Sequence, residues 1–178
     1  FDINYTRKLR NYYDSLDSYS FLYNYYDSIK TNDSIMKDLW SAELNYTYNK
    51  SKDSSITFFS IGTRIDAVSH LNYSIDTLFY NHSIISNYSK ESNKSKVSFS
   101  GEYFPFGFKK DNYNVYFDLK KYLSKKSILN LNFNMNNSRP TFELHNFFSN
   151  HNVWSNNFEN LLLVAARANI NLGKLSYD

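Results

Sequence analysis

The chain has 178 residues, of which 42% are hydrophobic and 19% aromatic, and its mean hydropathy is −0.59. No apolar run approaches the roughly 20 residues that a membrane helix needs, so the sequence excludes helical membrane spans. A net charge of +3 leaves no electrostatic footprint for nucleic acid, and the absence of cysteine excludes disulfides and thiolate metal sites.

Apolar and polar residues alternate with period two along most of the chain, which predicts about eight antiparallel strands. In chain order the positions on the apolar face are Phe1, Ile3, Tyr5 and Leu9; Trp40, Ala42, Leu44, Tyr46 and Tyr48; Phe59, Ile61, Thr63 and Ile65; Val97, Phe99, Gly101 and Tyr103; Tyr113, Val115, Phe117 and Leu119; Leu129, Leu131, Phe133 and Met135; and Leu162, Val164, Ala166, Ala168 and Ile170. A strand over residues 79–89 has a poorer pattern and is predicted because hairpins need an even number of strands.

The predicted links between these strands alternate in length. Links 50–55, 90–95 and 123–127 are short, whereas links 12–36, 67–78 and 138–160 are long and rich in aromatic residues, Asn and Ser, and link 104–112 is intermediate. Short turns on one edge and long loops on the other, joined by strands of about 10 residues, are typical of outer-membrane β-barrels. A soluble sandwich has no reason to sort its loops in this way.

Alternation alone leaves open which face of the sheet points inward. A soluble barrel would pack its apolar face inside, whereas a membrane barrel turns this face to lipid and keeps a polar lumen. Because the polar face consists mainly of Asn, Ser and Thr with scattered charges, it favours the membrane barrel. Aromatic residues near strand ends are interpreted as interfacial girdles: Tyr46, Tyr48, Tyr103, Phe104, Tyr113 and Tyr122. The predicted fold is therefore an all-β, antiparallel, up-and-down transmembrane barrel, or an arc of a larger one, with residues 1–178 as one unit.

Charged residues on the polar face are candidates for the lining of a pore, where rings of charge tune ion selectivity. These lumen candidates are Glu43, Arg64, Glu102, Asp118 and Arg167.

The long links hold a second set of candidates. The first link repeats a Tyr-Asp-Ser theme at Tyr13 and Tyr26, a combination that suits recognition surfaces. A loop that packs into the lumen or onto its neighbours explains the same residues without a ligand and is the preferred interpretation. His145 and His151 share the last link without the companions that a metal site needs.

No signature of catalysis is found in the sequence. A G-x-S-x-G nucleophile elbow is absent, and four glycines provide no phosphate-binding loop. We therefore expect no enzyme activity, no metal and no cofactor. A Ser-His-Asp site on a barrel rim stays open, because triads are defined by geometry rather than by sequence order.

Two phrases resemble a known family. SRPTFELHNFFSNHNVWSNNF, residues 138–158, and GEYFPFGFKKDN, residues 101–112, are similar to pieces of the putative porins of Bacteroidetes, with Trp154 and Phe158 as the aromatic residues of the loop pattern. The resemblance implies a larger barrel in the bacterial outer membrane with a role in passive transport and no catalytic residues. The chain begins at Phe1 without a leader, and residues 172–178 do not look like a closing strand, so we expect an internal portion of such a barrel.

The sequence therefore predicts a porin-like barrel for the diffusion of small solutes, with the lipid bilayer and other outer-membrane proteins as its partners. The first alternative is a surface receptor, adhesin or structural barrel that binds a partner through Tyr-rich loops, with His145, His151 and Trp154 among the contact candidates. The second is an outer-membrane enzyme, which requires a carboxylate or Ser beside His145 or His151.

Overall fold

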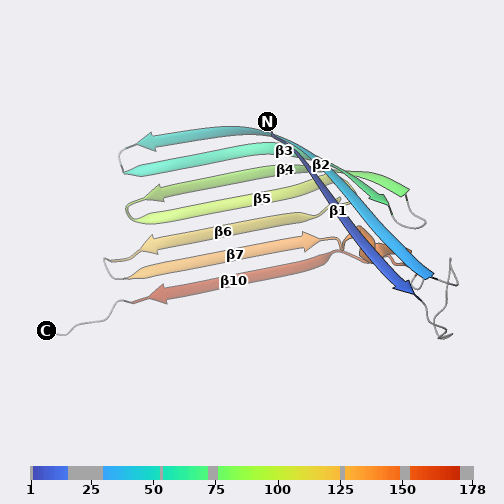
Figure 1. The fold of residues 1–178 in the computed structure, drawn as a ribbon. Helices are drawn as coiled ribbons and strands as arrows, with labels where there is room; N and C mark the ends of the chain where they lie inside the picture. The colour runs from blue at the N-terminus through green and yellow to red at the C-terminus, as the bar shows by residue number, and fades with distance from the viewer. Residues whose placement is uncertain are drawn as a thin grey trace.

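A computed structural model describes residues 2–15, 30–52, 54–71, 76–124, 127–148 and 153–172. Eight strands form one antiparallel sheet in which each strand pairs with its neighbours along the chain (Figure 1). They are β1 (Asp2–Ser15), β2 (Lys30–Lys52), β3 (Ser55–Leu71), β4 (Asp76–Ser92), β5 (Ser95–Gly107), β6 (Tyr113–Tyr122), β7 (Ile128–Ser138) and β10 (Leu161–Asn171). The short helix α1 (Phe142–His145) and a small hairpin of β8 (Asn146–Phe148) and β9 (Val153–Ser155) lie between β7 and β10.

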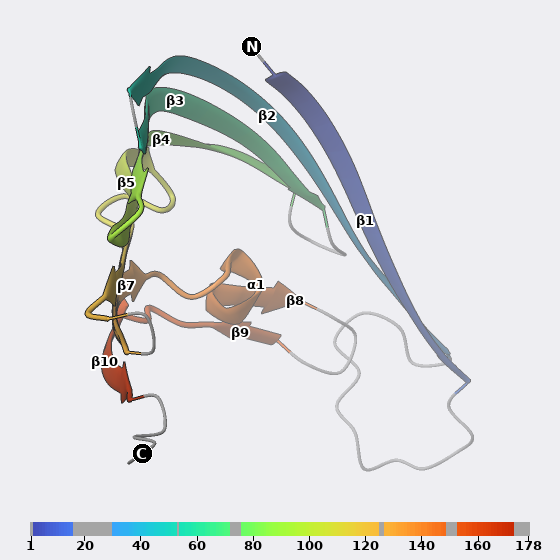
Figure 2. The same ribbon diagram turned by 90° about the vertical axis from the view of Figure 1, so that its left-hand side faces the viewer.

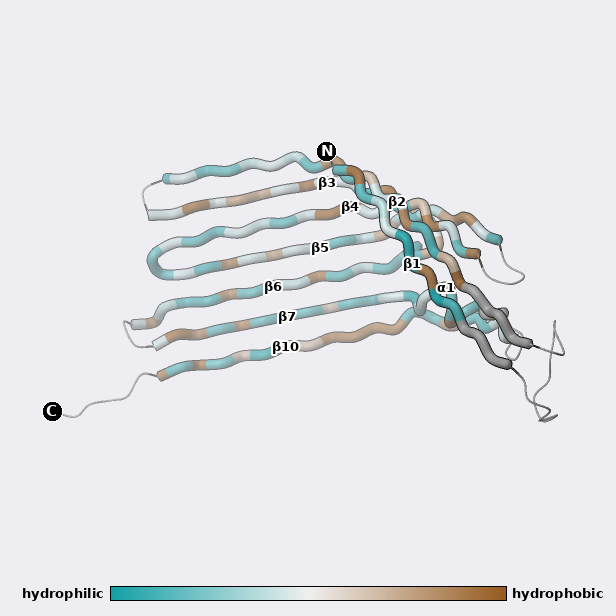
Figure 3. The backbone as a smooth tube through the Cα atoms, in the orientation of Figure 1, coloured by the Kyte–Doolittle hydropathy of each residue, from teal (hydrophilic) through white to brown (hydrophobic). Residues whose placement is uncertain are grey.

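The register places the apolar residues of neighbouring strands on one face. Phe133, for example, lies between Phe117 and Ala166, and Asn132 lies between Asp118 and Arg167 on the other face. Hydrophilic and hydrophobic residues alternate along the strands, and β10 is hydrophobic over most of its length (Figure 3). The sheet thus has one apolar face and one mostly polar face.

The sheet curves strongly, and α1, β8 and β9 lie on its concave side (Figure 2). Lys37 on the polar face donates a hydrogen bond to Glu143 of α1, so the polar face is the concave one. The apolar face is therefore convex and exposed, with Leu44, Ile65 and Leu162 each more than half accessible. Among the residues whose side chains the structure describes, only Val68 and Phe104 are buried hydrophobic residues, so apolar packing does not fill the hollow of the arc.

The predicted all-β fold is confirmed as an arc, because the sheet is not closed and β1 and β10 are its edge strands. All eight predicted strands are present, including the poorly patterned one, which is β4. The short links are also confirmed: residues 53–54, 93–94 and 123–127 connect the strands on one edge. A helical membrane span is absent from the described ranges, whose one helix has four residues.

The long links differ from the prediction. The predicted link 67–78 is wrong, because β3 and β4 stay paired to Leu71 and Asp76 and leave only residues 72–75 between them. Strands β1 and β2 likewise extend into the predicted link 12–36 and leave residues 16–29, which lie outside the described ranges. Backbone pairing continues in these places although the side chains no longer alternate, and alternation was the only signal for a strand.

Candidate functional site on the concave face

The described residues of 139–160, here called the inward segment, fold back onto the concave face instead of extending away from the sheet (Figure 2). Both ends of the segment are held by Asn112, which precedes β6 and is 6% exposed. Its Oδ1 accepts hydrogen bonds from Arg139 N at 3.0 Å and from Asn160 Nδ2 at 3.3 Å. One buried amide therefore fixes where the segment leaves β7 and where it returns to β10.

The turn that contains Asn112 is itself fixed to the wall. Buried Asn81 of β4 accepts a hydrogen bond from Lys109 N at 2.8 Å. Gly107 begins the turn with a φ of +102°, and a Cβ there would collide with the backbone of Tyr80 and lie 2.7 Å from Cα of Asn81. Because only glycine accepts this conformation and this close approach, residues 107–112 form a rigid support for the inward segment.

Aromatic side chains pack between the support and the segment. The aromatic cluster contains Phe79, Phe108, Phe142, His145 and Phe158, with centroid separations of 5.1 to 5.8 Å between neighbouring rings. The guanidinium of Arg139 lies 4.8 Å from the centroid of Phe108. Such pairs contribute about 0.5–1.5 kcal/mol each beyond the area that they bury, so the segment is packed against the wall as well as tethered.

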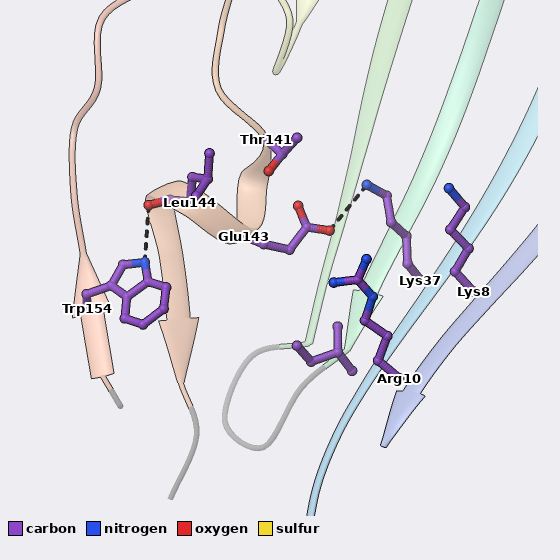
Figure 4. A pocket seen from close by; sticks show the side chains of 8 residues that line it. Lys8, Arg10, Lys37, Thr141, Glu143, Leu144 and Trp154 are labelled. Carbon is purple, nitrogen blue, oxygen red and sulfur yellow. Dashed lines mark hydrogen bonds and ion pairs between the residues drawn. The ribbon is translucent and has the colours of Figure 1, made fainter. Parts of the chain in front are cut away.

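A groove separates the inward segment from β1 and β2. It has a volume of about 500 Å³ and is lined by Lys8, Arg10, Ile35, Lys37, Thr141, Glu143, Leu144 and Trp154. Figure 4 shows the three cations extending from the strands toward α1, and Glu143 extending from α1 toward Lys37. Lys37 Nζ donates to Glu143 Oε1 at 3.3 Å, and on the other side Trp154 Nε1 donates to the carbonyl of Leu144 at 3.1 Å.

The carboxyl group of Glu143 is ionised in this setting. Burial alone would raise the pKa of Glu143, but a hydrogen bond from its own backbone N–H and the charge of Lys37 outweigh burial and lower it. Buried His70 of β3 also faces this carboxylate, with Nδ1 at 3.8 Å from Oε1. Glu143 is thus the electrostatic contact between the inward segment and the wall.

A second charged cluster, the Arg64 network, lies farther along the same face and contains three of the predicted lumen residues. Arg64 contacts Glu102 through Nη2, approaches Asp66 Oδ1 to 3.5 Å through Nε, and lies 3.9 Å from Glu43 Oε2 through Nη1. Asp66 also accepts a hydrogen bond from Ser41 at 2.7 Å. The structure therefore brings Glu43, Arg64 and Glu102 together and adds Asp66, which the sequence had not singled out.

The other two predicted lumen residues lie apart from this network. Asp118 accepts a hydrogen bond from Asn132 across the β6–β7 pair, and Arg167 is the β10 neighbour of Asn132. Arg167 also borders a shallow hollow with Tyr116 and Asn134. All five predicted lumen residues thus have register positions on the concave face, in two groups.

The loop candidates are distributed differently. Tyr26 and His151 lie outside the described residues, and the structure describes only the backbone of Tyr13. His145 is 3% exposed and its Nδ1 donates to the carbonyl of Asn156 at 3.0 Å, so it packs within the inward segment and presents no surface to a partner. Trp154 lines the groove. The hydrogen bonds that the structure gives the His145 side chain include no carboxylate and no Ser.

Sequence reasoning missed the groove residues Lys8, Arg10, Lys37 and Glu143 as a site. Alternation did place Lys8 on the polar face, but nothing in the sequence indicated that residues 139–160 fold inward to meet it. Groups of three or more potential metal ligands are absent from the described ranges.

Together these features define an open, up-and-down antiparallel arc with an apolar convex face, and a loop that turns into its polar hollow. Comparison of the chain with protein-family models, with curated proteins and with solved structures gives no match. The geometry of this chain is therefore the basis on which a function can be proposed.

Proposed function

We propose that the chain forms part of the wall of an outer-membrane β-barrel through which small solutes diffuse, and that the inward segment narrows the path. The observation that carries this proposal is the direction of curvature, which puts the apolar face outside and the polar face inside. A soluble barrel needs the reverse, because water would otherwise cover the convex apolar residues. Lipid is the environment that stabilises a convex apolar surface with a polar hollow behind it.

Two further features support this proposal. Tyrosines lie on the convex face near both ends of the strands, as expected of two interfacial bands. Tyr46 and Tyr48 lie toward the short turns, and the cross-strand pair Tyr103 and Tyr113 lies toward the opposite ends. Two of the predicted girdle residues do not fit, since Tyr122 has a concave register position and Phe104 is buried.

The edges of the arc agree with the proposal as well. The outer edges of strands β1 and β10 each carry a row of backbone N–H and C=O groups without a partner strand, and lipid tails cannot form hydrogen bonds with them. In a membrane both edges therefore need partner strands, which is the arrangement of an arc within a larger closed barrel.

The test uses single-cysteine labelling, because this chain contains no cysteine and any cysteine elsewhere in the full-length protein is first replaced by serine. Leu131 and Asn132 are consecutive residues of β7 with convex and concave register positions, and each is the matched control of the other. The protein that contains this chain is reconstituted in lipid vesicles as Leu131→Cys or Asn132→Cys, labelled with an environment-sensitive dye. We expect brominated lipid to quench the dye at position 131 only, and aqueous iodide to quench it at position 132 only.

Equal quenching of both positions by iodide would contradict a lipid-facing convex surface. Single-channel recordings of the same protein in planar bilayers then test diffusion itself, for which we expect a steady open conductance. An inserted but silent barrel would exclude free diffusion and favour the alternative, a barrel that binds a partner through its loops.

A further inference from the structure

The groove between the inward segment and β1–β2 carries more positive charge than its own carboxylate neutralises. Lys8 and Lys37 are direct cross-strand neighbours on the concave face, and Arg10 is the next residue of β1 on that face. Like charges opposite each other weaken a strand pair unless an anion lies between them. Glu143 pairs with Lys37, whereas Lys8 and Arg10 have no carboxylate partner among the residues whose side chains the structure describes, which are 2–11, 35–52, 54–71, 76–124, 127–146 and 154–172.

The shape and the remaining lining of the groove limit what can occupy it. A volume of about 500 Å³ is in the range of small-molecule sites. Leu144 and Trp154 of the inward segment form an apolar side, and the cations extend from the strands opposite α1, where Ile35 is the cross-strand neighbour of Arg10 (Figure 4). A bare inorganic anion would leave the apolar side in contact with water, and a neutral solute would leave the cations unpaired.

We propose that this groove binds a small organic anion, with its carboxylate or phosphate head between Lys8 and Arg10 and its apolar body against Leu144 and Trp154. A guanidinium and an ammonium together match such a head, because Arg donates two parallel hydrogen bonds to it and Lys adds a mobile point charge. Glu143 holds Lys37 and keeps the inward segment at the distance that leaves the groove open. The binding itself requires only the groove between the inward segment and β1–β2, whereas a role in selecting the solutes that diffuse through the barrel rests on the proposed function.

The chain offers a direct reporter of this binding. This chain has two tryptophans, Trp40 on the convex face and Trp154 in the groove, so Trp40→Phe leaves Trp154 as its one tryptophan. Subtracting the spectrum of the Trp40→Phe/Trp154→Phe protein removes the emission of the rest of the full-length protein. In this background the full-length protein in detergent is titrated at neutral pH with hexanoate, hexan-1-ol, hexylamine and inorganic phosphate. We expect a saturable change in Trp154 emission with hexanoate, a response at least about tenfold weaker with phosphate, which lacks the apolar body, and none with the alcohol or the amine.

Two groove variants test whether Lys8 and Arg10 bind the anionic head group. We expect Lys8→Gln and Arg10→Gln each to weaken hexanoate binding about tenfold, the value of one charge-assisted hydrogen bond, and added salt to weaken it further. Lys120→Gln is the matched control, because Lys120 has a concave register position on β6, away from the groove, and should leave the titration unchanged.

Hexan-1-ol binding as tightly as hexanoate, or unchanged hexanoate binding in both groove variants, would overturn the proposal. A protein that binds hexanoate but conducts no ions would contradict the proposed function and leave this inference standing. A conducting protein whose Trp154 emission does not change with hexanoate would contradict this inference and leave the proposed function standing.

Discussion

At the scale of single residues, Glu143 controls how the inward segment meets the wall. Its folded pKa is lower than the ordinary glutamate value of 4.5, so its ionised form stabilises the docked segment above that value, and the contribution is lost as pH falls through the folded pKa. We therefore predict that acidification below about pH 4.5 loosens the segment while the sheet persists. Trp154 emission measures the loosening, and far-UV circular dichroism measures the sheet.

The control for this prediction is Glu143→Gln, which should already show the loosened Trp154 signal at neutral pH and no acid step. His70, Lys37, Lys8 and Arg10 face the same carboxylate, and His70 is the group among them that titrates in acid. The variant His70→Asn shows which of the two groups, the Glu143 carboxyl or the His70 imidazole, causes the acid step. An acid step that survives in Glu143→Gln but disappears in His70→Asn would assign the effect to the histidine.

The Arg64 network makes a second prediction at this scale. Arg64→Met leaves Glu43, Asp66 and Glu102 close together without their cation, and Asp66 is buried. We expect a loss of about 1–3 kcal/mol in the free energy of unfolding, because Glu43 and Glu102 are 27% and 26% exposed and water screens their repulsion. In the proposed pore we also expect a shift of ion selectivity toward cations. Urea unfolding and reversal potentials in a salt gradient measure the two effects. The double variant Arg64→Met/Glu102→Gln should recover part of both, and an unchanged reversal potential would show that the network does not face the ion path.

Which of these residues could be predicted from sequence follows from their positions. Glu43, Arg64 and Glu102 are on regular strands, where parity alone assigns a face, and the structure places them together on the concave side. Glu143 and Asn112 are outside the strands, in segments whose direction depends on packing between Phe79, Phe108 and Phe142. No local periodicity encodes such contacts, so the groove could not be predicted.

At the scale of elements, β7 shows how strongly the two faces differ. Phe133 is central in the convex ladder between Phe117 and Ala166, whereas the next residue, Asn134, has a concave position opposite Tyr116. If the convex face contacts lipid, we expect Phe133→Lys to destabilise the folded protein by about 2–4 kcal/mol in bilayers, the cost of a lysine near the bilayer midplane.

Asn134→Lys is the matched control, and we expect it to cost less than about 1 kcal/mol, because its side chain reaches water. Refolding into lipid vesicles in a urea series measures both variants. Equal destabilisation by the two lysines would contradict a lipid-facing convex surface.

Strand boundaries were harder to predict than strand identities, for a reason visible in β1 to β4. Backbone hydrogen bonds continue wherever two antiparallel strands remain side by side. The apolar-polar alternation continues only where one face of the sheet is removed from water. The residue pairs Ser69 with Leu78 and His70 with Thr77 are still in the ladder although they break the alternation. Alternation therefore marks the part of a strand with a distinct apolar face and underestimates the whole strand.

At the scale of the whole molecule, the inward segment is an insertion into an otherwise regular hairpin. Leu161 of β10 pairs directly with Ser138 of β7, so the ladder does not require the residues between them. A two-residue Asn-Gly turn would join the strands with the twist that hairpins favour. The eight-stranded wall, which the apolar-polar alternation predicts, and the inward segment in the hollow are thus distinct parts of the chain.

This separation allows the role of the segment to be tested without altering the wall. We predict that replacing residues 139–160 by Asn-Gly leaves the far-UV spectrum of the sheet intact, raises the single-channel conductance of the proposed pore and abolishes hexanoate binding, because the segment carries one whole side of the groove. Titration calorimetry measures the binding, since Trp154 is removed with the segment. Lys94→Gly in the short turn on the opposite edge is the control and should change neither property. A shortened protein that keeps the original conductance would show that the segment lies outside the narrowest part of the proposed path. The constriction would then have to be formed by the wall, where Arg64 lies together with Glu43, Asp66 and Glu102.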